Sequence, residues 1–207
     1  MSNIWLTSDW HFNHDKEFIW KARGFESVQE MNKAIIERHN SKVEDEDDVY
    51  VLGDLIMGDL EEGEKCLQQL KGKLHIVLGN HDTNNRIKMY EKYAEEIFYA
   101  MPLKYKKRTF FLSHYQTLTA NMDDRPGHCT FNIHGHTHQT TNDTVGFRGM
   151  YHVGMDSHDC YPVHIDDVIA GLKAQYEEST EKSVLFTIWV AITVLIFTHA
   201  LRFFLPI

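Results

Sequence analysis

The sequence predicts a layered domain of the α/β or α+β class. Short apolar runs alternate with helical stretches in the first half of the chain, and strands dominate the second half. A chain of 207 residues holds one ordinary domain and a short addition. Its composition, 43% hydrophobic and 25% charged, is typical of a folded globular protein. We therefore expect a domain over residues 1–174, a polar linker over 175–182 and a separate apolar segment over 183–205.

Six apolar runs predict the strands of this domain. Three lie in the first half, and each ends at a cluster of small or polar residues: 3–7, 48–52 and 73–78. Three follow in the second half: 103–106, 109–112 and 130–133.

Helical spacing predicts three helices between these strands. In 27–42 the apolar residues Val28, Met31, Ala34 and Ile35 recur on one face. Ser27 would be the N-cap, with Glu30 completing a capping box. The other two helices cover 60–70, which closes near Gly72, and 86–96.

Charge and composition restrict the function. The chain has 21 Lys and Arg against 30 Asp and Glu, which argues against non-specific nucleic-acid binding, although a charged site still attracts phosphate locally. Fourteen histidines are an unusually large number, and neutral imidazole is a common metal ligand. Cys66, Cys129 and Cys160 form no disulfide framework or zinc-knuckle pattern and fit a reducing compartment. The first residues carry no secretory-signal pattern.

Polar clusters follow directly on the predicted strands. A single aspartate at a strand end is usually a helix cap or a turn residue. Here four strand ends are rich in Asp, Asn and His, and the carboxyl ends of strands are where ligands bind in layered α/β folds. The clusters are Ser8-Asp9-Trp10-His11, Gly53-Asp54, Gly79-Asn80-His81-Asp82 and His134-Gly135-His136-Thr137-His138.

The residue types in these clusters indicate a metal site. Asp9 and His11 are two residues apart and can reach one ion if the backbone bends, and His136 and His138 have the same spacing. Carboxylate, amide and imidazole ligands without thiolate suit Mn²⁺, Fe or Zn²⁺. The ligands are too many for one four-coordinate ion. Two ions that share a bridging carboxylate would use them all, and such pairs characteristically hydrolyse phosphate esters.

Five motifs in order resemble the calcineurin-like metallophosphoesterases. They are Asp9-Trp10-His11, Gly53-Asp54, Gly79-Asn80-His81-Asp82, His114 and Gly135-His136-Thr137-His138. The chain is most similar to the small bacterial and phage-type members, which share Asp9–His14, Asp48–Asp54 with its spacing shifted by one, Val153–Asp156 and Tyr161–Val163. The resemblance covers roughly residues 3–172 and leaves out the C-terminal segment.

The resemblance implies a fold, a cofactor and a set of roles. The fold would be two packed mixed β-sheets flanked by helices. One divalent ion would be held by Asp9, His11, Asp54 and His138, and the other by Asp54, Asn80, His114 and His136. Mn²⁺ is the first expectation, with Fe, Zn²⁺, Ni²⁺ and Mg²⁺ as alternatives. A hydroxide between the ions would attack phosphorus in line, while His81 stabilises the phosphoryl oxygens or protonates the leaving group and Asp82 orients its ring.

Two further residues are candidates for substrate binding. His14 extends the first motif toward substrate or metal, or is an exposed loop residue. Arg23 would clamp a phosphate, or is a solvated surface arginine. We interpret His134 as a packed, hydrogen-bonded core residue. No motif supports a functional role for His39, His75, His128, His152, His158 and His164.

The leading hypothesis is a dinuclear metal-dependent phosphoesterase that acts on small phosphodiesters or nucleotides. Phosphomonoesterase or protein phosphatase activity is the alternative within the enzyme class, because the metal core is common to all of them. A catalytically silent scaffold of the same fold is the rival outside it. A scaffold commonly loses a ligand or the histidine of the Gly-Asn-His motif, whereas all seven ligands and His81 are present here.

The apolar C-terminal segment predicts a membrane anchor. Val184–Leu201 is eighteen residues without a formal charge, fourteen of them apolar, which as a helix nearly crosses a bilayer core. Its four polar residues scatter around the helix, so it lacks the polar face of a surface helix. The expectation is a C-terminal transmembrane helix with the enzyme on the cytoplasmic side. The alternative is a hydrophobic helix docked on the domain or on a dimer partner.

Overall fold

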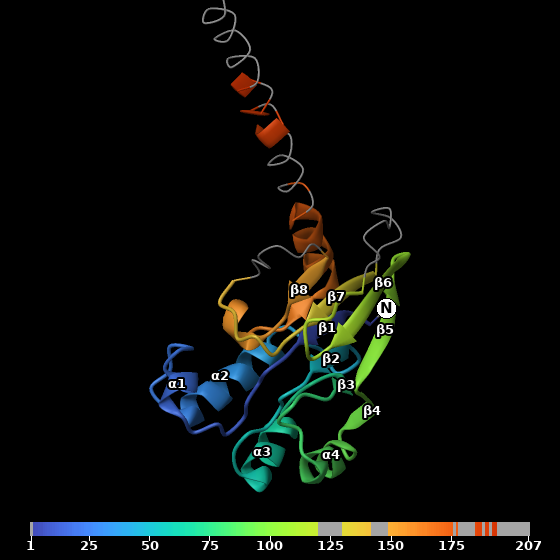
Figure 1. The fold of residues 1–207 in the computed structure, drawn as a ribbon. Helices are drawn as coiled ribbons and strands as arrows, with labels where there is room; N and C mark the ends of the chain where they lie inside the picture. Colours follow the sequence, from blue (N-terminus) through green and yellow to red (C-terminus); the bar gives the residue numbers. More distant parts are fainter. Residues whose placement is uncertain are drawn as a thin grey trace, which may run out of the picture.

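The computed structural model describes residues 2–119, 130–141, 149–175, 177, 185–187, 189–190 and 192–193. Within them, two mixed β-sheets pack face to face with helices outside (Figure 1). The fold expected from the family resemblance is therefore confirmed.

The first sheet has five strands in the order β4-β3-β2-β1-β9. β1 (Ile4–Thr7), β2 (Asp48–Leu52), β3 (Lys73–Val77) and β4 (Ala94–Phe98) run parallel. β9 (Val163–His164) pairs antiparallel with β1. Because β1, β2 and β3 are parallel neighbours, their carboxyl ends open at one edge of the sheet, where three of the polar motifs begin.

The second sheet has four strands in the order β5-β6-β7-β8. β5 (Ala100–Tyr105) pairs antiparallel with β6 (Arg108–Ser113), and the pairings from β6 to β7 (Thr130–His134) and β8 (Met150–His152) are parallel. The carboxyl ends of β6 and β7 carry the other two motifs. A parallel bridge between Ser8 and Gly154 joins the two sheets at this end.

Helices flank the two sheets. α2 (Val28–Asn40), α3 (Leu60–Leu67) and α4 (Asn84–Tyr90) lie on one side of the first sheet, and residues 165–175 form a helix beside β7 and β8 (Figure 1). The short α1 (Glu17–Trp20) lies beside α2, and the 3₁₀ turn η1 (Met155–Ser157) follows β8.

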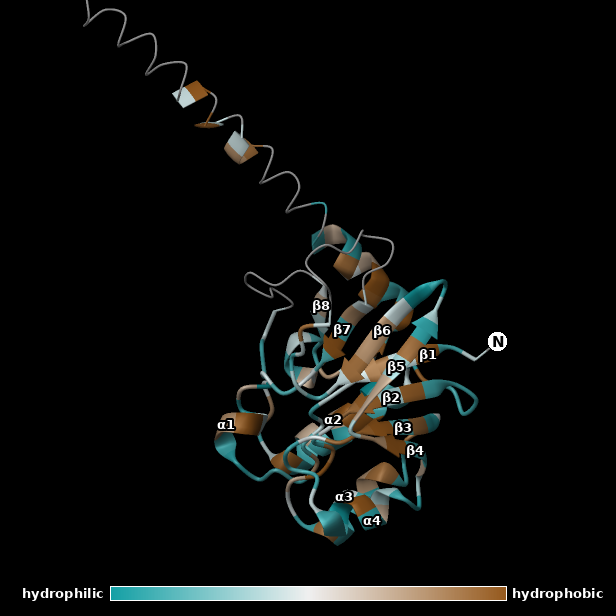
Figure 2. Cartoon of the chain, turned by 45° about the vertical axis from the view of Figure 1, so that its right-hand side comes forward, coloured by the Kyte–Doolittle hydropathy of each residue, from teal (hydrophilic) through white to brown (hydrophobic). Residues whose placement is uncertain are grey.

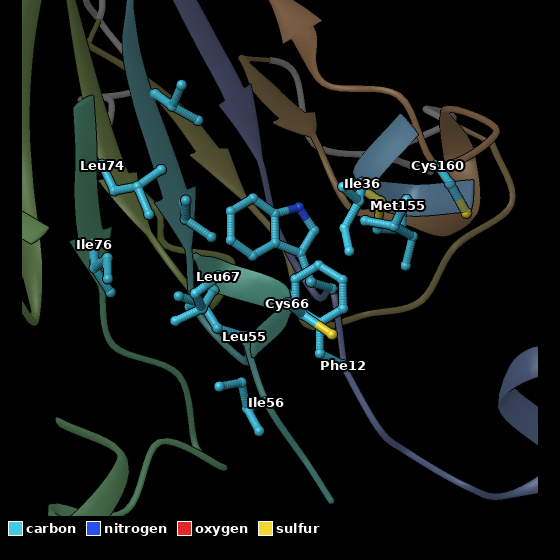
Figure 3. Packing of buried hydrophobic residues seen from close by; sticks show 14 of the residues in the cluster. Phe12, Ile36, Leu55, Ile56, Cys66, Leu67, Leu74, Ile76, Met155 and Cys160 are labelled. Atoms are coloured by element: carbon cyan, nitrogen blue, oxygen red, sulfur yellow. The ribbon is translucent and has the colours of Figure 1, made fainter. Parts of the chain in front are cut away.

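The alternation of side chains along β2 separates two hydrophobic cores. Val49 and Val51 face the helices, whereas Tyr50 and Leu52 face the second sheet. Figure 3 shows the helix-side core, in which Leu74 and Ile76 of β3 pack near Leu67 of α3. In the core between the sheets, β2 meets Phe110 and Leu112 of β6 and Ile133 of β7, and the helix at 165–175 adds Val168. Packing on both faces fixes the strand ends that carry the polar motifs.

The sequence prediction of the helix at 86–96 is wrong in its second half. α4 ends at Tyr90, and turn hydrogen bonds from Lys92 and Tyr93 close it. The following residues form β4, which gains a backbone ladder to β3. Tertiary pairing therefore outweighs the local helical preference of Ala94–Glu96. The sequence analysis also did not predict four other elements, namely β8, β9, α1 and the helix at 165–175.

The cap of α2 differs in one hydrogen bond from the predicted capping box. The Ser27 hydroxyl accepts from the Glu30 backbone N–H at 3.2 Å, as predicted. The Glu30 carboxylate accepts from the Glu26 backbone N–H at 2.7 Å rather than from that of Ser27. The Glu30 carboxylate therefore caps the turn before α2 instead of the Ser27 backbone N–H.

The expected membrane-spanning segment, Val184–Leu201, lies mostly outside the described residues. Among the residues that the structure describes, no helix is both long enough and apolar enough to span a bilayer.

Candidate metal centre

The backbone bends sharply at the ends of the strands that carry the motifs. Five motif residues have a positive φ angle, between 48° and 67°: Asp9, His11, Asp54, His136 and His138. This left-handed conformation is uncommon for residues other than glycine and costs of order 1 kcal/mol or more each. Such a cluster marks a functional site, because the rest of the fold must hold it in place.

Hydrogen bonds between the loops hold these bends. The Asp9 N–H donates to Gly53 O and the His11 N–H donates to Asp54 O, both at 3.0 Å, so the loop after β1 is joined to the loop after β2. The bend that the Asp9–His11 spacing required is therefore present, and both side chains turn to the same side.

Three side chains form the first group of ligand atoms. The Nε2 atoms of His11 and His138 are 3.2 Å apart, and Asp9 Oδ1 lies 3.7 Å from the first and 3.9 Å from the second. Ligands about 2.0–2.2 Å from one ion stand about 3–4 Å from each other. All three atoms lie within 4.8 Å of one another, so they can hold one ion.

A second group surrounds His114. Its Nε2 lies 3.4 Å from Asp54 Oδ2, 3.0 Å from Asn80 Oδ1 and 3.2 Å from His136 Nδ1. Asp54 Oδ2 is also 4.0 Å from His11 Nε2, in the first group. Asp54 therefore lies between the two groups of candidate ligand atoms.

The polar atoms present fit a divalent cation. Asp9 Oδ1 is buried without a hydrogen-bond partner in the described part of the chain, on a side chain with no exposed surface. A buried carboxylate oxygen left without a donor is costly, and a cation removes that cost. Glycine permits the close approach of the loops, because a Cβ at Gly135 would overlap Ser8 Oγ and Asp9 Oδ2. The donors are oxygen and imidazole nitrogen, which hard and borderline divalent ions prefer.

Outer hydrogen bonds fix which ring nitrogen of two histidines faces the site. His114 Nδ1 donates to the Leu52 carbonyl at 2.7 Å, which leaves Nε2 free to ligate. His138 Nδ1 lies 2.8 Å from Asp156 Oδ2, so its Nε2 faces Asp9. A hydrogen bond at the outer nitrogen orients the ring and raises the basicity of the inner one.

The charges of the site shift several pKa values. Burial acts against ionisation of Asp9 and Asp54, but the facing histidines outweigh it, and the pKa of each carboxyl is lowered. Burial acts against protonation of His114, but Asp54 and Asp9 raise its pKa overall. The hydrogen bond to Asp156 raises the pKa of His138. Each carboxylate is therefore held in its anionic, ligating form.

Asp156 is a functional residue to which the sequence interpretation gave no role. It belongs to the Val153–Asp156 stretch that resembles the family, but it lies eighteen residues after His138 and no local spacing connects the two. The parallel pairing of β7 with β8 brings Asp156 to the outer ring nitrogen of His138.

Arg23 is neither a solvated arginine nor a free phosphate clamp. Its side chain is 1% exposed. All five of its N–H donors have acceptors, namely both Asp156 oxygens, the carbonyls of Asp9 and Trp10, and Met31 Sδ. Arg23 thus supports the backbone of the first motif and is not available to substrate.

Asp82 does not contact the His81 ring, contrary to the expected role. One carboxylate oxygen accepts from the backbone N–H groups of Asp54 at 2.9 Å and Gly79 at 2.8 Å. The other accepts from the Tyr90 hydroxyl at 2.8 Å. Asp82 is buried, and these three hydrogen bonds tie it to Asp54, Gly79 and Tyr90, so its carboxylate holds the loop that carries Asp54.

His81 lies at the open side of the centre, with a side chain 44% exposed. Its Nε2 is 4.0 Å from Asp54 Oδ2, and its backbone N–H donates to Asp54 Oδ1 at 2.9 Å. Arg86 donates to the carbonyls of His81 and Met57 and fixes this loop. His81 is therefore positioned beside the ligand groups but accessible to substrate.

His14 lies next to the site. Its ring centroid is 5.3 Å from that of His11, and it lines the same pocket as His81. Burial and the nearby His11 and His81 lower its pKa to about 4, so it is neutral at pH 7. His134 is fully buried and its Nδ1 donates to Gly135 O at 3.0 Å, in agreement with the predicted core role.

Comparisons with known proteins agree with this site. A family model described as the calcineurin-like phosphoesterase superfamily domain matches residues 3–154. The uncharacterized protein MJ1445 of Methanocaldococcus jannaschii is 32% identical over 177 residues, 82% of this chain and 90% of that protein. The gene 66 protein of Mycobacterium phage L5 is 31% identical over 86 residues, 40% of this chain and 41% of that protein.

Among solved structures, the protein of unknown function AQ665 from Aquifex aeolicus has a TM-score of 0.64 at 22% identity. The match covers 82% of this chain and 99% of that one and shows a shared fold. The family model covers most of the described domain, including the motifs from Asp9 to His138, and the archaeal relative extends over most of both chains. The chain therefore belongs to the calcineurin-like phosphoesterase superfamily and is a metal-dependent phosphoesterase.

Proposed function

We propose that the enzyme uses two divalent cations, with Mn²⁺ as the first expectation, to hydrolyse phosphodiesters. One ion would be held by Asp9, His11, Asp54 and His138. The other ion would be held by Asp54, Asn80, His114 and His136. The position of Asp54 Oδ2, 4.0 Å from His11 Nε2 and 3.4 Å from His114 Nε2, is the observation that supports this assignment most strongly. When bound, two such ions lower the pKa of an attacking water and neutralise charge on the phosphoryl oxygens.

The residues of the chain would supply proton transfer and orientation. His81 is exposed toward the pocket and not fixed by a hydrogen bond between its ring and Asp82. It can therefore reach a phosphoryl oxygen or the oxygen of the leaving group, and imidazole is suited to giving up a proton near neutral pH. Asp82 and Arg86 hold the loop on which His81 and Asp54 depend.

We infer small phosphodiesters or nucleotides as the substrate class, with phosphomonoesters as the alternative. The pocket beside His81 has a volume of about 720 Å³, which is within the usual range for a small-molecule site.

The test is a panel of monoester and diester substrates assayed with Mn²⁺, Fe²⁺, Zn²⁺, Ni²⁺ and Mg²⁺. We expect turnover of diesters that requires a metal and is abolished by a chelator. Selective turnover of monoesters would favour the alternative, and no turnover with any metal would contradict the proposal.

We also propose, from the sequence alone, that Val184–Leu201 anchors the enzyme to a membrane with its catalytic domain on the cytoplasmic side. The support is the uncharged apolar run described above. Full-length protein should sediment with membranes and resist high-salt extraction. Full-length protein that stays in solution without detergent would contradict the anchor and favour a docked helix.

A further inference from the structure

A pocket of about 720 Å³ opens directly beside the metal centre. His11, His81 and His138 line its inner side. A leaving group attached to a phosphorus atom at the centre would therefore extend into this pocket, next to the residue proposed to protonate it. The inference below rests on the proposed function of this centre.

The outer wall of the pocket is apolar and comes from α1 and the residues just after it. Phe18, Ile19 and Ala22 line the pocket, yet α1 buries no residue of its own. The Phe18 side chain is 69% exposed. A large apolar group left in water is costly unless a ligand covers it. Figure 2 shows α1 at the edge of the domain, partly brown and partly teal.

The shape and chemistry of this wall favour an aromatic ligand. The Phe18 and His14 rings are 5.8 Å apart in an edge-to-face arrangement, which leaves ring surface available for stacking. Met57 and Met155 also line the pocket, and thioethers make favourable contacts with aromatic rings.

The charges of the pocket disfavour an anionic ligand. Arg23 is the one Lys or Arg among the described lining residues, and its five N–H donors are already used. Asp159 adds an exposed carboxylate to the same lining. A leaving group that carries its own phosphate would meet a negative charge and no free cation from the described lining residues.

We propose that this pocket binds the leaving group of the substrate, and that this group is an uncharged aromatic of aryl or nucleobase size. Phe18 is then a specificity-determining residue. It sets which ester is accepted, while the ligand groups and His81 set how phosphorus is attacked.

Two methyl aryl phosphodiesters test this, one with a para-chloro and one with a para-sulfonate group on the ring. The two phenols have similar acidity, and the sulfonate-bearing phenol is the slightly stronger acid, so leaving-group acidity does not favour the uncharged ester. Full-length protein with Mn²⁺ should nevertheless hydrolyse the uncharged chloro substrate with the higher kcat/KM. Phe18→Ala should lower kcat/KM for that substrate about tenfold, mainly by raising KM, because an apolar contact is lost in the bound state.

The matched control is Tyr99→Ala, which removes another exposed aromatic, 82% exposed and outside this pocket. It should leave kcat/KM within about twofold of the unmodified protein. Ala22→Lys places a free cation in the wall and should shift the preference toward the sulfonate substrate. The metal content of each variant is measured to check that the metal centre is intact.

If Phe18→Ala and Tyr99→Ala change kcat/KM of an active enzyme equally, this inference is overturned and the proposed function stays in place. Equal use of both substrates by the unmodified enzyme would also overturn it. No hydrolysis of any phosphoester with any metal would instead refute the proposed function, and this inference with it.

Discussion

The Asp156 carboxylate joins His138 to Arg23. One of its oxygens lies 2.8 Å from His138 Nδ1, and the other accepts from Arg23 Nε at 3.0 Å. Arg23 in turn donates to the Asp9 carbonyl at 2.8 Å. Burial acts against ionisation of Asp156, but His138 and Arg23 outweigh it and lower its pKa, so it is an anion at neutral pH. Two predicted ligands that are far apart in sequence are therefore fixed by one buried ion pair.

Replacing Asp156 by Asn should weaken metal binding about 10- to 100-fold, because His138 loses the carboxylate that orients it. Isothermal titration with Mn²⁺ measures this effect. Asp166→Asn is the control, since Asp166 forms an exposed ion pair with Lys106 and is not one of the candidate ligands. Unchanged Mn²⁺ affinity in the Asp156 variant would show that this contact does not support the site.

Arg23→Met should destabilise the fold by about 3–5 kcal/mol, because a buried carboxylate loses its partner. Lys21→Met is the matched control, since Lys21 forms an exposed ion pair with Glu17 and should change stability by less than about 1 kcal/mol. Urea unfolding gives both values. Similar values for the two variants would contradict the structural role of Arg23.

Asp82 and His81 should behave differently, although they are adjacent in one motif. Asp82→Ala should lower Mn²⁺ affinity about 10- to 100-fold, because the Asp54 loop loses its acceptor. His81→Ala should bind Mn²⁺ normally and lower kcat about 10²- to 10⁴-fold if it acts as the general acid. If Asp82→Ala binds metal normally and loses only turnover, Asp82 acts through His81 after all.

Stability should fall in mild acid partly through His39. This residue is 1% exposed, its Nε2 lies 2.9 Å from Lys71 O, and burial lowers its pKa to about 4. Between pH 6.5 and about 4 the unfolded chain binds a proton that the folded chain does not, so stability decreases as pH falls through this window. Across this window, the contribution of His39 lowers the free energy of unfolding by about 3 kcal/mol.

The pH prediction is checked by urea unfolding of the unmodified protein and His39→Gln at pH 7 and pH 4.5 in a chelator. The variant should lose less stability between the two pH values. An identical loss in both proteins would show that His39 does not contribute.

Most of the fold was predictable because apolar runs and polar strand ends are local patterns. The run before Asp9 and the run before Asp54 each predict a buried strand, and both are observed. β4 was missed because its residues have a helical preference that only pairing with β3 overrides. β9 was missed because it has two residues and exists through its ladder to β1.

Motif order was enough to name the candidate ligands, but not the residues that support them. Asp9, Asp54 and His114 offer ligand atoms within 4.8 Å of one another, although the family resemblance assigned Asp9 and His114 to different ions. The supporting roles depend on contacts between separate segments, such as those of Arg23 with Asp9, 14 residues away, and with Asp156, 133 residues away. No sequence spacing reports such contacts, so a surface arginine and a ring-orienting aspartate were reasonable but wrong expectations.

The number of Mn²⁺ ions bound per chain tests the central claim most directly. Chelator-treated protein is titrated with Mn²⁺, and bound metal and phosphodiester hydrolysis are measured in the same samples. The proposed dinuclear centre predicts two ions per chain at saturation, activity that appears with the second ion, and loss of both binding and activity in Asp54→Ala. Full activity with one ion per chain, or in Asp54→Ala, would contradict it.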